Sequence, residues 1–168
     1  MKHLPFLLFA LAFGCTPIAT YPPVENYTAL AFSNPANEPV PTIMAETIMY
    51  AHKHFGGMDT IVFNLPVGIK EDVYSIVANK IGGATPMTRV DQVAYHITEL
   101  RVRGFDAEAE VVFPSASSEY EMATIKLKTS IVGPWVVTDY RVWKIPVRGS
   151  LAPSMPTTDI AEVDTTAQ

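Results

Sequence analysis

Two hydrophobic periodicities divide the chain near Val93. Before this residue, apolar positions recur every three to four residues, which is typical of amphipathic helices. The first such stripe consists of Met44, Ile48, Ala51 and Phe55. It predicts a helix over residues 43–55, with Thr42 available to cap its start and Gly56-Gly57 to end it. The stripe would face the core of the protein.

A second helix and a short strand follow the first stripe. Residues 60–65 (TIVFNL) are β-branched and aromatic, which predicts a buried strand. Residues 70–81 show the helical period again, with acidic Glu71 and Asp72 near the start and Lys80 near the end. These charges suit the dipole of a helix that ends before Gly82-Gly83.

After Val93 the period changes from 3.6 to 2, which predicts strands. We expect strands over 93–103, 105–113, 120–132 and 135–147, with a turn at Gly133-Pro134. At Gly104 we expect either a turn with Arg103 or a bulge within one long bent strand. Pairing Val132 with Trp135 would place Lys128 opposite Asp139. The whole pattern predicts an α+β fold, in which helices pack on one face of a curved, mostly antiparallel sheet of four to five strands.

Charged and titratable residues offer few candidates for catalysis. Asp106, Glu108 and Glu110 alternate with apolar residues, so we interpret them as a solvated strand face with Lys126 and Lys128 opposite. A catalytic carboxylate pair would need two different environments, which this pattern does not indicate. We assign no catalytic residue and no cofactor.

Besides His3 near the start, the chain has three histidines, His52, His54 and His96. Zinc requires three or four converging ligands, and residues two apart on a helix point in different directions. We therefore predict no metal site from His52 and His54. His96 is the nearest candidate for a polar group in a pocket.

Cys15 is the only cysteine of the chain, and it follows a short apolar segment. Lys2 and His3 precede the uncharged residues 4–13, a run too short to span a bilayer but typical of a signal peptide. The sequence LAFGCTP resembles the lipobox of bacterial lipoproteins, although Ala12 stands where that motif usually has leucine. The resemblance implies removal of residues 1–14 and acylation of Cys15, with fatty acids such as palmitate.

The same resemblance implies a location and partners. Thr16, rather than an aspartate, follows the cysteine, which implies the outer membrane facing the periplasm. The partners would be the membrane, through the lipid, and an envelope protein. The net charge of −5 argues against binding to nucleic acid.

Composition divides the rest of the chain into domain and tails. Residues 15–41 carry the lipid and six prolines, which predicts an extended tether, with residues 27–32 (YTALAF) as an alternative edge strand. Residues 42–147 form the predicted domain. Residues 148–168 are rich in Ser, Thr and Pro and are predicted to be disordered.

The segments VRGFDAEAEVVFP, YEMATIKLK and GPWVVTDYRVWKI resemble the strand pattern of the nuclear transport factor 2-like (cystatin-like) superfamily. The resemblance implies a curved sheet that either enzymes or non-catalytic modules can use. The sequence therefore favours a membrane-anchored, non-catalytic accessory or binding module. The alternative is a small pocket enzyme or a carrier of a small ligand.

Overall fold

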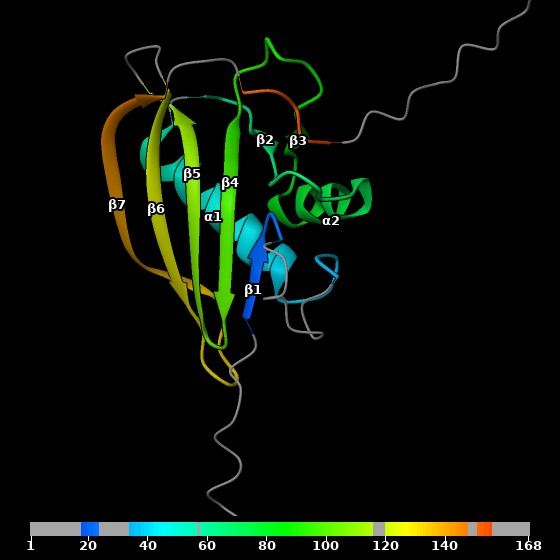
Figure 1. The fold of residues 1–168 in the computed structure, drawn as a ribbon, viewed down its shortest axis with the longest axis vertical. Helices are drawn as coiled ribbons and strands as arrows, with labels where there is room; N and C mark the ends of the chain where they lie inside the picture. The colour runs from blue at the N-terminus through cyan, green and yellow to red at the C-terminus, as the bar shows by residue number, and fades with distance from the viewer. Residues whose placement is uncertain (1–17, 24–33, 57, 116–119, 148–150, 156–168) are drawn as a thin grey trace, which may run out of the picture.

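Over residues 18–23, 34–56, 58–115, 120–147 and 151–155, which the computed structural model describes, the chain forms two helices and one seven-stranded sheet (Figure 1). The helices are α1 (Val40–Phe55) and α2 (Glu71–Ile81). The strands are β1 (Ile18–Tyr21), β2 (Val62–Asn64), β3 (Thr85–Pro86), β4 (Tyr95–Arg103), β5 (Asp106–Pro114), β6 (Tyr120–Lys128) and β7 (Val136–Val147). The predicted α+β class is confirmed.

The sheet is mixed but mostly antiparallel. Its order is β3-β2-β4-β5-β6-β7, and β2 pairs in parallel with both β3 and β4. The long strands β4 to β7 form an antiparallel meander. The antiparallel strand β1 pairs with the second half of β4, on the edge that β2 occupies along the first half.

The predicted number of four to five strands is too low. The two additional strands, β1 and β3, have four and two residues. Strands this short cannot display a hydrophobic alternation that a sequence pattern would detect. Their conformation comes from pairing with a neighbour, because β1 bonds to β4 and β3 bonds to β2.

Helix α1 packs against β4, β5 and β7 and fills one face of the meander (Figure 1). Ile43, Met44, Ile48 and Ala51 on this helix are completely buried. They meet the inward side chains of the strands, such as Leu100 on β4, in one continuous core. The helix begins at Val40, two residues before the predicted cap at Thr42, which instead donates a hydrogen bond to Glu38.

The register of the strands explains which charges meet on the uncovered face. Asp106 pairs with Lys128 and Glu108 with Lys126, as the alternation predicts. The β6–β7 register, however, differs by two residues from the prediction, so that Asp139 lies opposite Lys126 rather than Lys128. The two-residue shift holds from Met122 to Lys126 and keeps these side chains on their predicted face, whereas an irregularity after Lys126 makes the shift three residues at Leu127 and Lys128.

Two described segments that were assigned to the tether and to the tail belong to the folded domain. Ala19 and Tyr21 of β1 are buried, so residues 18–21 are part of the sheet. Residues 151–155 contact the core, because Ala152 and Ser154 hydrogen-bond to Asn64. In both segments a few apolar or polar contacts hold the chain in place, although the surrounding sequence is rich in proline.

Several predictions lie outside the described residues. These are the signal peptide over 1–14, Cys15 with Thr16, the alternative strand over 27–32, and the end of the tail beyond residue 155. No helix within the described ranges is long and apolar enough to cross a membrane.

Candidate functional site

A buried polar cluster surrounds Asn64, at the end of β2. The side chain of Asn64 is 4% exposed, and its Oδ1 accepts hydrogen bonds from the Tyr74 hydroxyl and from the Ser154 N–H, both at 2.9 Å. Its Nδ2 lies 3.0 Å from the carbonyl oxygen of Ala152 and 3.2 Å from Oγ of Ser154. Asn64 therefore holds the segment after β7 against the sheet.

His96 lies beside Asn64 because β2 and β4 run parallel with these two residues in register. Nδ1 of His96 lies 3.3 Å from Nδ2 of Asn64, which has only hydrogens to offer. Nδ1 therefore accepts, and the ring proton of the neutral imidazole sits on Nε2. Nε2 is buried and has no hydrogen-bond partner among the described residues.

Burial also sets the charge of His96. The residue is 2% exposed, and burial lowers the pKa of its imidazole to about 4. The ring of Tyr120 packs edge-on against the imidazole, with 5.6 Å between ring centroids. At neutral pH, His96 is thus an uncharged hydrogen-bond donor in an apolar setting.

Helix α2 completes the cluster from the other side. Tyr74 is completely buried, and its hydroxyl accepts a hydrogen bond from the N–H of Leu65 while it donates to Asn64. Burial raises the pKa of Tyr74 to about 12, so this hydroxyl keeps its proton. The first turn of α2 and the end of β2 are thereby fixed relative to each other.

A groove of about 420 Å³ borders this cluster, and we call it the His96 groove. Asn64, His96, Thr98 and Ser154 supply its polar groups, and its apolar walls come from β2, the loop after it and residues 151–153. The volume is within the range of small-molecule sites.

The other two histidines of the domain contact different residues. Nδ1 of His52 lies 3.2 Å from the Tyr95 hydroxyl, whereas the exposed ring of His54 stacks on Tyr50. His96 is on a different element, and the structure does not bring it to either of them. Within the described ranges, no three His, Cys, Asp or Glu side chains form a group that could hold a metal ion.

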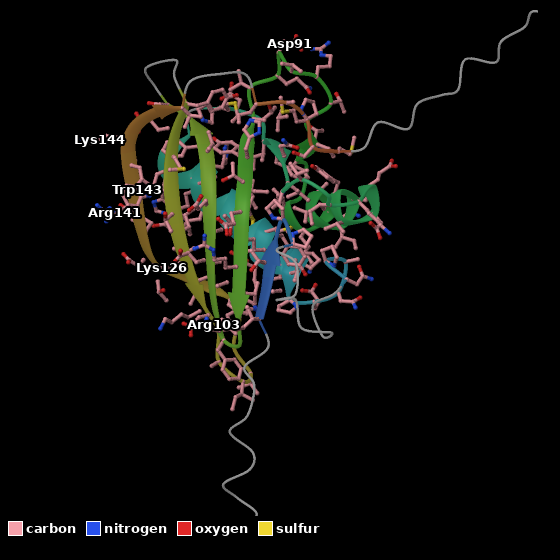
Figure 2. The ribbon with its side chains drawn as sticks, viewed as in Figure 1. Asp91, Arg103, Lys126, Arg141, Trp143 and Lys144 are labelled. Carbon is pink, nitrogen blue, oxygen red and sulfur yellow. The ribbon has the colours of Figure 1, made fainter. Side chains whose placement is uncertain are left out.

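The three carboxylates of β5 lie on the sheet face that α1 does not cover. Asp106 pairs with Lys128 at 3.1 Å, and Glu108 lies 3.6 Å from Arg101. This confirms that lysines lie opposite Asp106 and Glu108, whereas Glu110 pairs with Thr124. On the same face, Arg141 stacks on Trp143, whose Nε1 donates to Thr124 (Figure 2).

Sequence reasoning identified His96 but missed Asn64, Tyr74 and Ser154. One signal was present, because Asn64 interrupts the apolar strand TIVFNL with a polar residue. A polar side chain in a buried strand needs hydrogen-bond partners. The partner at Ser154 is 90 residues away and could not be found from the local pattern.

Comparisons with known proteins found no relatives. The sequence matches no protein-family model and no curated protein, and the fold matches no solved structure.

Proposed function

We propose that this chain is a lipid-anchored protein of the bacterial cell envelope that serves as a non-catalytic binding or accessory module. The observation that carries the proposal is the position of Cys15, the only cysteine, directly after an apolar segment of signal-peptide length. Acylation would leave no free thiol in an oxidising compartment. Several acyl chains on one residue give firm anchoring, since one chain alone binds only marginally.

The packing of α1 supports a non-catalytic role. In a nuclear transport factor 2-like protein, the concave face of the curved sheet would be the place for a pocket. Here that face is occupied by Ile43, Met44 and Ile48 of α1, which are completely buried. We propose the resemblance to that superfamily at the level of the fold, with helices on one face of the curved sheet, and not at the level of an active site.

Membrane fractionation tests the anchor. We expect the unaltered chain in the outer membrane of the producing bacterium, and Cys15→Ser either in the soluble periplasmic fraction or as an unprocessed precursor. Thr16→Ala is the matched control, because it changes the neighbouring residue and keeps the thiol. Equal partition of the unaltered chain and Cys15→Ser into membranes would refute the proposal.

The His96 groove favours a second candidate, a carrier of a small ligand. Its support is the groove of about 420 Å³ lined by His96, whose buried Nε2 has no hydrogen-bond partner in the part of the chain that the structure describes. Native mass spectrometry of the purified protein would detect a retained molecule in this groove. His96→Leu should release it, whereas His54→Leu, at an exposed position, should not. Identical spectra for the unaltered protein and both variants would exclude the carrier function.

A further inference from the structure

Two hairpin tips form one apolar end of the sheet. The β4–β5 turn contains Gly104, at φ 58°, and Phe105. The β6–β7 turn contains Ile131 and Val132 and is closed by a hydrogen bond from the N–H of Gly133 to the carbonyl oxygen of Ser130. A further bond of 2.9 Å from the N–H of Thr129 to the carbonyl oxygen of Phe105 holds the two turns together. The two turns are thus joined by the backbone and form one surface.

The side chains at this end are unusually exposed for apolar groups. Phe105 is 55% exposed, Val136 50%, Ile131 87% and Val132 97%. Ile131 and Val132 have the largest exposed fractions among the large apolar side chains of the described residues. We call these four residues the tip patch. Contiguous exposed apolar groups mark interaction surfaces.

The chain enters the domain at this same end. Ile18, the first residue of β1, pairs with Arg103, the last residue of β4, and Gly104 and Phe105 follow directly (Figure 1). Cys15 precedes Ile18 by three residues, which span at most about 10 Å of extended chain. An acyl chain on Cys15 would therefore enter the bilayer within about 10 Å of Ile18.

We propose that the tip patch is a membrane-contacting surface, which rests in the interfacial layer of the bilayer that holds the lipid of Cys15. The inference depends on the proposed lipid anchor. The short connection to Ile18 leaves this end facing the membrane. Apolar tip side chains would then exchange water for the boundary between headgroups and acyl chains.

The charges beside the tip patch fit an anionic lipid surface. Arg103 lies at the lower end of the molecule in Figure 2, directly before the β4–β5 turn. Lys128, which pairs with Asp106, precedes the β6–β7 turn and remains largely exposed. Cationic side chains near a bilayer are attracted to anionic headgroups. Vesicles that test this surface should therefore contain an anionic lipid such as phosphatidylglycerol.

Thiol accessibility in the lipidated full chain tests the inference. Val132→Cys places one thiol in the tip patch, and Val93→Cys is the matched control, since Val93 is 49% exposed and lies before the other end of β4. The nine residues of β4 separate the two ends by about 26 Å. The readout is the rate of reaction with a membrane-impermeant maleimide, in detergent and in vesicles of phosphatidylethanolamine and phosphatidylglycerol.

We expect the thiol of Val132→Cys to react about tenfold more slowly in vesicles than in detergent, because an apolar environment shields the thiol and disfavours the thiolate. The thiol of Val93→Cys should react equally fast in both. Equal rates for Val132→Cys, with Cys15 acylated, would overturn the inference alone. A reactive, unmodified Cys15 would overturn the proposed anchor and this inference together.

Two other occupants of the tip patch give different results. If a second copy of the chain covers the patch, protection disappears when the protein is diluted with additional lipid. If an envelope protein covers it, protection is seen in native membranes and not in the vesicles. Either result overturns the assignment to lipid.

Discussion

His96 and Asn64 are buried polar residues that lie side by side in the sheet. Their register on the parallel pair β2 and β4 brings two buried polar side chains together. Asn64 has partners for both ends of its amide, whereas Nε2 of His96 has none within the described ranges. An unmatched buried donor costs stability unless a ligand or water meets it.

Stability should fall in acid because of His96. Its pKa in the folded protein is about 4, against an ordinary value of 6.5, so the unfolded chain takes up the proton first. The stabilisation is complete above pH 6.5 and is lost as the pH falls towards 4, by about 3 kcal/mol in total. Urea unfolding across this range should show a weaker pH dependence for His96→Gln than for the exposed-site control His54→Gln.

Asn64→Ala should destabilise the protein by about 2 kcal/mol, because it removes the acceptor to which the buried Tyr74 hydroxyl donates at 2.9 Å. It should also free the segment around Ser154, which limited proteolysis would detect as earlier cleavage. Asn79→Ala, at an exposed position of α2, is the control for urea unfolding. A stability equal to that of the control would contradict the role of Asn64.

At the scale of elements, the described residues place β1 in the folded sheet. Residues 18–21 pair with β4 along its last four positions, and Ala19 is completely buried. The predicted tether over 15–41 therefore contains four residues, 18–21, that are part of the sheet. If Cys15 carries the proposed lipid, the three residues from Cys15 to Ile18 would restrict how far the domain can move from the bilayer.

Ala19→Asp should destabilise the fold by several kcal/mol, since it places a carboxylate at a completely buried position in the apolar core. Thr20→Asp changes the next residue, which faces the uncovered side of the sheet beside Arg101 and Arg103. We expect Thr20→Asp to unfold at nearly the same urea concentration as the unaltered protein. Similar losses for both variants would argue that β1 is only loosely attached.

Long elements were predictable, and of the three short strands β2 was predicted, within residues 60–65, whereas β1 and β3 were not. The strands β4 to β6 and both helices display their periodicity over nine or more residues, so their faces could be assigned from sequence. The predicted β6–β7 register was wrong by two residues at Lys126. The chain reverses over residues 130–133, and not at the predicted turn Gly133-Pro134. The cluster at Asn64 depends on Ala152 and Ser154, whose proline-rich segment reads as disordered.

At the scale of the whole molecule, the two ends of the sheet differ in chemistry. One end carries the tip patch and the start of β1, and the other carries the His96 groove. If the first end rests on the bilayer, the second opens towards the periplasm. A ligand or partner would then reach the groove without competition from the membrane.

The central claim is that Cys15 anchors the domain, and the mass of the N-terminal peptide tests it most directly. Protein extracted from membranes should begin at Cys15, and this residue should carry the mass of a diacylglycerol group and, after full processing, an additional acyl chain. A peptide that begins at another residue, or one that contains Cys15 with a free thiol, would contradict the account.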